Sequence, residues 1–296
     1  MSNSGESLPQ SLSHLAPSTR RQAALDDAER IRITQGDRWI DYPRALRARE
    51  HLDRLLTTPK RERMPCMVVH GDSNIGKTLI LHKFQREHPP AFDYEVGVER
   101  RPVISMQMPA TPDQHRFYSA LLFELGAPHS ANARLSVLER LARELLRRMA
   151  PKMLIVDEVH HLLAGSYQEQ RASLNLVKYL ANDLKMSIVL AGTSDAMIAL
   201  NTDAQMRSRF ASFEIPRWRE SEEFRGLLKA FERVIPLRKP SHLDQRLTAQ
   251  FLLAASDGLK GEVSRLLNTA AELAIRDRSE CINLGHLEHV VRRAAA

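Results

Sequence analysis

The chain has 296 residues, of which 43% are hydrophobic and 27% are charged, a composition typical of a globular protein with a sizeable core. Lysine and arginine outnumber aspartate and glutamate by seven, and the sequence pI is about 9.6, so the charge is compatible with a polyanionic partner but does not establish one. Two cysteines exclude a disulfide framework, and no apolar run approaches the ~20 residues that span a bilayer. These features predict a soluble, cytoplasmic protein without a membrane partner.

Composition and apolar spacing divide the chain into four predicted parts. Residues 1–21 are rich in serine and proline and predict a disordered tail, and residues 22–60 have helical periodicity and predict an N-terminal helical arm. Residues 61–216 alternate apolar strands with helices, and residues 217–296 show four helical patterns. Strands without polar alternation are buried on both faces. The predicted fold class is therefore α/β, with a parallel sheet covered by helices on both faces, followed by a small α-helical lid domain.

The predicted elements follow one another in a regular order. In chain order they are a helix from about 22, a helix at 42–59, a strand at 66–70, a helix from 77, a strand at 101–108, helices at 111–126 and 133–149, a strand at 152–158, a helix at 171–185, strands at 187–193 and 210–216, and helices at 221–234, 245–256, 261–277 and 285–295.

The segment GDSNIGKT matches the phosphate-loop pattern G-x-x-x-x-G-K-[ST] at every fixed position. It follows an apolar strand and opens a helix, which is the context that this pattern requires. Glycines let backbone N–H groups converge on phosphate oxygens, the lysine reaches the β- and γ-phosphates, and the threonine hydroxyl binds Mg²⁺. The predicted ATP-binding residues are Gly71, Asp72, Ser73, Asn74, Ile75, Gly76, Lys77, Thr78 and Leu79.

The segment MLIVDE places two carboxylates after a buried strand. In a phosphate-loop hydrolase, Asp157 would hold Mg²⁺ together with Thr78, through the water shell of the ion, and Glu158 would polarise the attacking water. The guanine-reading motif of a GTPase has no good counterpart here. ATP hydrolysis is therefore the favoured chemistry.

Three further residues are candidates for the same reaction. Thr193, with Ser194 as the second choice, ends the strand SIVLAGT and would sense the γ-phosphate or orient water, although either residue is also suited to begin a helix. Arg207 and Arg209 precede the last strand, and either guanidinium could act as an arginine finger on the nucleotide of a neighbouring subunit.

The combination of G-x-x-x-x-G-K-T, a strand ending in Asp-Glu, and Ser-Arg-Phe before a helical lid resembles the AAA+ P-loop NTPases. The segments WIDYPRA, RMPCMVVHGDSNIGKTLILHKF, MLIVDEVHHLLAGS and SIVLAGTSDA resemble the TniB family of transposition ATPases more narrowly, a family related in function to TnsC and MuB. The resemblance extends over nearly the whole chain after the tail. It implies that Arg209 is the finger, with Arg207 as its substitute.

The resemblance also implies how this site departs from its relatives. Many AAA+ lids begin G-x-x-R, with an arginine that senses nucleotide, but this chain reads GLKGEVSRLL and has Gly261 at that position. Lys260 or Arg265 would compensate only in part. Slow hydrolysis, with ATP acting mainly as an assembly switch, is the expected consequence.

The resemblance to TniB further implies an ATP-dependent homo-oligomer, a ring or a helical filament, on double-stranded DNA without strong sequence preference. Its expected protein partners are a TniA-like DDE transposase and a TniQ-like protein. The candidate DNA contacts are Arg116, Arg171 and Lys178, each of which is otherwise a solvated residue on a helix. The alternative functions are an ExeA-like secretion ATPase and an ATP-responsive adaptor with little hydrolysis.

Two other features have weaker interpretations. Trp39 is expected to stack on adenine or on a neighbouring subunit. His160 and His161 follow the acidic pair, but adjacent residues do not share a helical face as i,i+4 metal ligands do, so the sequence predicts polar packing for them rather than a metal site.

Overall fold

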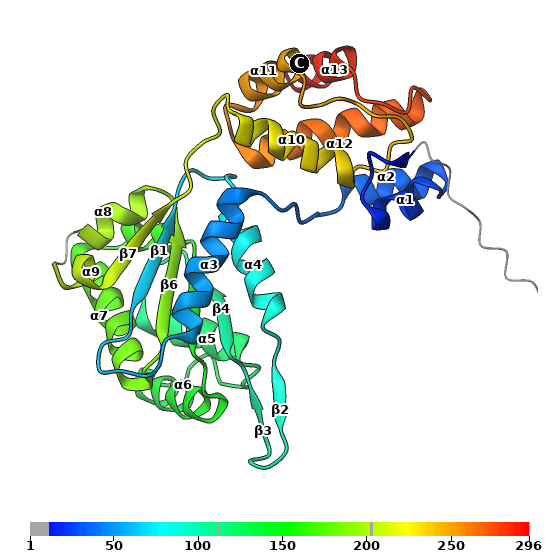
Figure 1. The fold of residues 1–296 in the computed structure, drawn as a ribbon. Helices are drawn as coiled ribbons and strands as arrows, with labels where there is room; N and C mark the ends of the chain where they lie inside the picture. Colours follow the sequence, from blue (N-terminus) through cyan, green and yellow to red (C-terminus); the bar gives the residue numbers. More distant parts are fainter. Residues whose placement is uncertain (1–11, 112, 202–203, 296) are drawn as a thin grey trace, which may run out of the picture. The chain divides into compact units, whose positions relative to one another are not determined.

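The computed structural model describes residues 12–111, 113–201 and 204–295, and these form two compact units (Figure 1). The α/β unit is Arg47–Pro216, and the helical unit combines the chain up to Leu46 with the chain from Arg217 onward. None of the helices within the described ranges is long and apolar enough to cross a membrane.

The centre of the α/β unit is a five-stranded sheet, as the sequence predicted. Its strands are β1 (Cys66–His70), β4 (Val103–Gln107), β5 (Met153–Asp157), β6 (Ser187–Gly192) and β7 (Phe210–Glu214). They lie in the order β4-β5-β6-β1-β7, and every neighbouring pair is parallel. The carboxyl ends of all five strands therefore meet at one edge of the sheet, which is where ligands bind in folds of this class.

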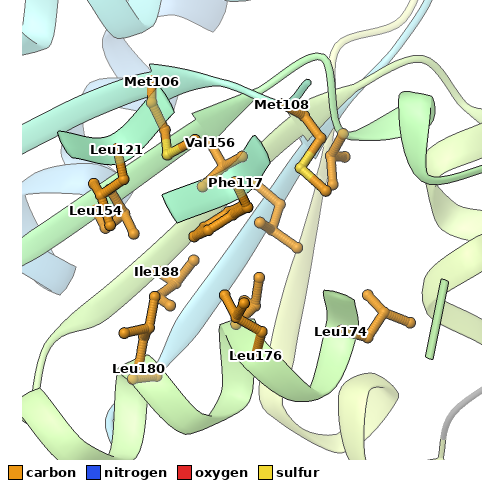
Figure 2. Packing of buried hydrophobic residues seen from close by; sticks show 14 of the residues in the cluster. Met106, Met108, Phe117, Leu121, Leu154, Val156, Leu174, Leu176, Leu180 and Ile188 are labelled. Carbon is orange, nitrogen blue, oxygen red and sulfur yellow. The ribbon is translucent and has the colours of Figure 1, made fainter. Parts of the chain in front are cut away.

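Helices cover both faces of this sheet, and successive residues of each strand point to opposite faces. Ile104, Leu154 and Ile188 belong to the main core cluster, whereas the residues that follow or precede them do not. The α-helices that contribute more than one buried residue to this cluster are α5 (Gln114–Glu124), α6 (Leu135–Met149), α7 (Tyr167–Leu184) and α8 (Asp195–Asn201). Figure 2 shows Phe117 and Leu121 of α5 and Leu176 and Leu180 of α7 packed around strand side chains.

The other face is covered by α3 (Pro43–Thr57) and α4 (Lys77–Glu87) (Figure 1). An ion pair joins the two helices, with Arg49 Nη2 2.6 Å from Glu87 Oε2. The remaining elements of the unit are the 3₁₀ helix η2 (Val159–Ala164), α9 (Ala204–Arg209), and a β-hairpin of β2 (Ala91–Asp93) and β3 (Val98–Arg100). The sequence did not predict this hairpin, because strands of three residues are too short to show a period.

Among the described residues, the helical unit contains two N-terminal and four C-terminal α-helices. They are α1 (Pro17–Ala23), α2 (Asp27–Gln35), α10 (Glu222–Val234), α11 (Arg246–Ser256), α12 (Lys260–Arg276) and α13 (Leu284–Ala295). The fully buried Arg30 of α2 donates to both carboxylate oxygens of Glu280, each at 2.7 Å, and to the Pro236 carbonyl oxygen. This contact attaches α2 to a segment 250 residues away in the chain.

The N-terminal boundaries differ from those predicted. Within the predicted tail of residues 1–21, residues 12–21 are ordered, because Leu12, Leu15 and Ala23 bury one another in a small core and α1 begins at Pro17. Residues 1–11 lie outside the described residues. The predicted arm, residues 22–60, is divided between the two units at Leu46, since its first part packs with the C-terminal helices and its last part with the sheet.

Candidate nucleotide site

The phosphate loop joins β1 to α4, and its path depends on two glycines. A Cβ on Gly71 would lie 2.4 Å from the Ile215 carbonyl oxygen, so a side chain does not fit there. Gly76 precedes α4 with a φ of 104°, in the left-handed region that favours glycine. A glycine-rich turn at a helix N-terminus exposes several backbone N–H groups in one direction, and this arrangement attracts phosphate.

The other predicted ATP-binding residues before α4 lie in the same turn, whereas Leu79 belongs to the first turn of α4. Ile75 is buried and anchors the loop to the core, whereas Ser73 and Asn74 are exposed, and Asn74 has a φ of 64°. Asp72 and Leu79 are half-buried. Burial of Ile75 holds the loop in place, whereas Ser73 and Asn74 beside it are open to solvent.

The amine of Lys77 lies inside this loop. The residue is 7% exposed, and its Nζ donates hydrogen bonds to the carbonyl oxygens of Gly71 and Asp72, both at 2.9 Å. Burial lowers the pKa of Lys77, while the nearby carboxylates of Asp157 and Glu158 oppose that shift. The amine is thus held at the centre of the loop, where it can meet a phosphate oxygen.

Asp157 completes the site from the neighbouring part of the sheet. It is the last residue of β5 and is buried, and its Oδ2 accepts a hydrogen bond from the Thr78 hydroxyl at 2.7 Å. Its Oδ1 accepts from the Glu158 backbone N–H at 2.8 Å. A hydroxyl and a carboxylate oxygen side by side are the ligand types that Mg²⁺ prefers, so this donor set fits the ion.

Glu158 turns away from the strand with a φ of 56°, which places its carboxylate outside the sheet. The side chain is 37% exposed, and its Oε2 lies 3.2 Å from His160 Nδ1. Its charge opposes the lowering of the pKa of Lys77, which places the carboxylate near the phosphate loop.

Thr193 lies at the same edge of the sheet, because it follows Gly192 of β6, which pairs with His70 immediately before the loop. Its hydroxyl donates to Asp195 Oδ2 at 3.5 Å, and α8 begins at Asp195. The structure therefore combines both features that the sequence suggested at this place, a polar strand end and a helix start.

The family model for the bacterial TniB protein matches residues 30–220, which is more than half of the chain and contains the whole of this site. The chain belongs to the TniB family. A search of curated proteins returned no match to it.

Solved structures similar to this TniB chain include several origin recognition proteins. The ORC2 protein of Aeropyrum pernix, in ADPNP and ADP complexes, is 15% identical over 88% of this chain and 71% of its own, with a TM-score of 0.63. The ORC1 protein of the same organism, in complex with DNA, is 20% identical over 85% of this chain and 64% of its own, with a TM-score of 0.58. Cdc6p of Pyrobaculum aerophilum is 15% identical over 87% and 68%, with a TM-score of 0.59. At these identities the likeness establishes the fold, that of an AAA+ P-loop NTPase.

The two arginine candidates lie at the opposite edge of the sheet. Arg209 directly precedes Phe210, which pairs with Cys66 at the start of β1, whereas the phosphate loop follows the end of that strand. At about 3.3 Å per residue, the two ends of β1 are roughly 13 Å apart. Arg209 and the phosphate loop of its own TniB chain therefore lie at opposite ends of β1.

The surroundings of these two arginines differ. Arg209 is half-buried, and its Nε and Nη2 are buried without a hydrogen-bond partner among the described residues. Burial raises the pKa of the Cys66 thiol, and the Arg209 guanidinium beside it opposes that rise. Arg207 is exposed. Of the two candidates, Arg207 is therefore the more accessible.

The candidate DNA contacts lie on two helices that touch each other, since Gln114 Nε2 of α5 donates to the Ala172 carbonyl oxygen of α7 at 3.4 Å. Arg116 and Arg171 are exposed. Arg116 donates a hydrogen bond to the Thr111 hydroxyl, and Arg171 donates one to the Tyr167 hydroxyl and also lies over the Tyr167 ring. Lys178 is half-buried and follows Arg171 by seven residues, so the two share a face of α7.

The interpretation of His160 and His161 was wrong in one respect. The two histidines are adjacent in sequence, yet their ring centroids are only 4.8 Å apart. Both lie in the 3₁₀ helix that follows the turn at Glu158. Sequence reasoning also missed Met108, whose backbone N–H donates to the Asp157 carbonyl oxygen at 2.8 Å. The signal for this contact was the polar Gln107 at the end of a buried strand, which pairs with Asp157.

Proposed function

We propose that this TniB chain is an ATP-dependent, DNA-binding regulator of transposition, which assembles on target DNA with ATP and recruits and activates a TniA-like DDE transposase. The observation that carries the proposal is the combination of Lys77, Thr78, Asp157 and Glu158 at one edge of the sheet in a member of the TniB family. A TniQ-like protein is the further expected partner.

In this proposal the phosphate loop and Leu79 hold ATP, and Thr78 and Asp157 hold Mg²⁺. When bound, the ion would neutralise charge on the phosphate oxygens. Lys77 binds the outer phosphates, Glu158 accepts a proton from the attacking water, and Thr193 orients that water or senses the last phosphate. The position of Gly261 supports slow turnover, so that bound ATP lasts long enough to act as an assembly signal.

The chains would assemble through the nucleotide. Because Arg209 lies at the other end of β1 from its own phosphate loop, it is suited to act on the nucleotide of the next chain, and Arg207 is the exposed substitute. Repetition of this contact generates a ring or a helical filament, depending on whether the rotation closes.

DNA binding is proposed for the surface of α5 and α7 that carries Arg116, Arg171 and Lys178. The net charge of +7 supports a polyanionic partner, and one of the similar structures is a complex with DNA. Contacts to phosphates rather than to bases would give binding without strong sequence preference.

A second candidate is an ATP-responsive adaptor that hardly hydrolyses ATP, and one observation favours it. Lys260, the nearest cation before Gly261, is 5% exposed and lies between the Tyr42 and Phe231 rings, with its Nζ 5.6 and 5.9 Å from their centroids. A lysine held in this way is poorly placed to replace the missing sensor arginine.

Binding to random duplex DNA tests the proposal. The protein with ATP should bind DNA and form oligomers, and both should be lost without ATP or in Lys77→Ala, as measured by fluorescence anisotropy and sedimentation. Affinity should fall steeply as salt rises. DNA binding that is indifferent to both nucleotide and Lys77 would refute the ATP switch. ATP-dependent assembly without measurable hydrolysis would favour the adaptor.

The DNA surface has its own test. Alanine at Arg116, Arg171 or Lys178 should weaken binding to all DNA sequences alike. The slope of the logarithm of the binding constant against the logarithm of the salt concentration should decrease in magnitude by about one for each phosphate that the removed side chain bound. Arg140→Ala, which removes an exposed arginine on α6, is the matched control and should bind as the unchanged protein does. Equal effects of all four substitutions would show that only net charge matters.

A further inference from the structure

Glu158, His160 and His161 bring three metal-ligating groups together beside the phosphate loop. One carboxylate oxygen and one nitrogen of each ring lie within 4.8 Å of one another. The turn at Glu158 and the 3₁₀ helix after it produce this convergence, which residues so close in sequence would not reach in an α-helix.

His161 is held as proteins hold a metal-binding histidine. Its Nδ1 lies 3.0 Å from the Met108 carbonyl oxygen. A carbonyl oxygen only accepts hydrogen bonds, so Nδ1 carries the proton and Nε2 carries the free lone pair. Met108 is in turn bonded through its N–H to Asp157. A backbone carbonyl that orients the ring from behind is the usual outer partner of a metal-bound imidazole.

His160 and Glu158 have the spacing of two ligands of one ion. His160 Nδ1 lies 3.2 Å from Glu158 Oε2 and is buried, yet it makes no hydrogen bond of acceptable geometry within the described ranges. Two ligands of a tetrahedral zinc ion, each about 2.0–2.1 Å from the metal, are about 3.3 Å apart. The distance therefore suits a shared cation as well as an ion pair, and His160 Nδ1 has no direct hydrogen bond of acceptable geometry among the described residues.

An ion can reach the cluster from solvent. All three residues are partly exposed, and His161 and Met108 line a cavity of 720 Å³ next to α5. A zinc site with three protein ligands takes a water molecule as its fourth ligand.

We propose that Glu158, His160 and His161 form a zinc site. Two imidazoles and one carboxylate favour Zn²⁺ over Mg²⁺, which prefers oxygen ligands only. The consequence rests on the proposed function: zinc would occupy the carboxylate that accepts the proton from water and would stop hydrolysis, while the phosphate loop stays able to bind ATP. Zinc would thereby hold the chain in its ATP-bound state.

Zinc binding is tested first without nucleotide, so that the result does not depend on ATPase activity. The full chain is titrated with Zn²⁺ against a chromophoric chelator, and Co²⁺ is used as a probe because four-coordinate Co²⁺ absorbs strongly in the visible range. We expect one ion per chain. Affinity should fall at least about tenfold in His161→Ala and in His160→Ala. His82→Ala removes an exposed histidine of α4 and should bind as the unchanged protein does. Circular dichroism confirms that each variant is folded.

Hydrolysis is then measured at saturating Mg²⁺ with increasing Zn²⁺. Zinc should inhibit the unchanged protein and His82→Ala at the concentrations that fill the site, and should inhibit His161→Ala only at concentrations about tenfold higher or more. Equal zinc affinity in all variants would overturn the site, whatever the ATPase result. If the protein binds zinc at this site but does not hydrolyse ATP, the zinc site stands and the proposed ATPase activity is refuted.

Discussion

Gly71 shows how strongly the phosphate loop depends on single atoms. The loop passes so close to the end of β7 that even a methyl group at this position would overlap the Ile215 carbonyl oxygen. The sequence pattern predicted the glycine, but only the structure shows what it must avoid. Thr78 and Asp157 are 79 residues apart in the chain, yet the Thr78 hydroxyl lies 2.7 Å from the Asp157 carboxylate.

Gly71→Ala should abolish ATP binding and lower the free energy of unfolding by about 1–3 kcal/mol, because the backbone must shift to admit the methyl group. A fluorescent ATP analogue and calorimetry measure the two effects. Gly226→Ala is the control, since a Cβ there meets nothing within 4 Å and alanine favours the helix α10 by up to about 1 kcal/mol. ATP binding by Gly71→Ala at unchanged affinity would contradict this account of the loop.

The burial of Lys260 predicts how the stability of the protein changes with pH. Burial lowers its pKa to about 8 from an ordinary value of 10.5, against an opposing effect of Asp37. Between these values the unfolded chain binds more protons than the folded chain, so this residue makes stability rise with pH from about 8 to 10.5. Lys260→Met should be more stable than the unchanged protein at pH 7, because no charge is then buried, and this advantage should shrink as the pH rises.

Urea unfolding at several pH values measures this difference. Both tryptophans of the chain, Trp39 and Trp218, belong to the helical unit, so their fluorescence reports on the unit that contains Lys260. Lys229→Met is the control, because the Lys229 side chain is 65% exposed and should show no such trend. A Lys260→Met variant that is less stable at pH 7 would show that contacts with the aromatic rings outweigh the burial of charge.

At the scale of elements, long periodic segments were predictable and short ones were not. The helices α3, α6 and α7 and the five strands of the sheet follow apolar patterns that extend over enough residues to be recognised. The helix α2 has almost no apolar face, and its place depends on the ion pair between Arg30 and Glu280. No local pattern in the sequence predicts a partner 250 residues away.

Arg30→Met should lower the free energy of unfolding of the helical unit by about 3–5 kcal/mol, because it leaves the mostly buried Glu280 carboxylate without its main partner. Tryptophan fluorescence during urea unfolding measures the loss. Arg32→Met, on the same helix, breaks the exposed pair with Glu29 and should cost less than about 1 kcal/mol. Similar losses in both variants would show that the buried pair does not hold α2 in place.

At the scale of the whole molecule, the parallel sheet separates the two halves of the proposed catalytic machinery. The phosphate loop, Asp157, Glu158 and Thr193 all follow carboxyl ends of strands, whereas Arg209 precedes an amino end. One chain therefore presents a nucleotide site at one edge and an arginine at the other. This arrangement favours the proposal that neighbouring chains complete each other's sites.

Mixing two inactive variants tests that proposal. Glu158→Gln and Arg209→Ala should each lose ATP hydrolysis while they keep the ability to assemble. In an equal mixture about a quarter of the interfaces should combine an intact Glu158 with an intact Arg209 from the next chain, and a corresponding fraction of the activity should return. Recovery with Arg207→Ala in place of Arg209→Ala would assign the finger to Arg207. Failure of both mixtures to recover would refute catalysis between chains.

The sequence by itself determined the phosphate loop, the acidic pair, the α/β fold and the resemblance to TniB, because each depends on residues that are close together in the chain or repeat with a regular period. Only the tertiary structure decided which edge of the sheet carries Arg209, that the N-terminal helices pack with the C-terminal ones, and that two adjacent histidines meet Glu158. These features depend on strand order, on a buried ion pair between distant residues, and on one left-handed turn, and none of them has a periodic signature in the sequence.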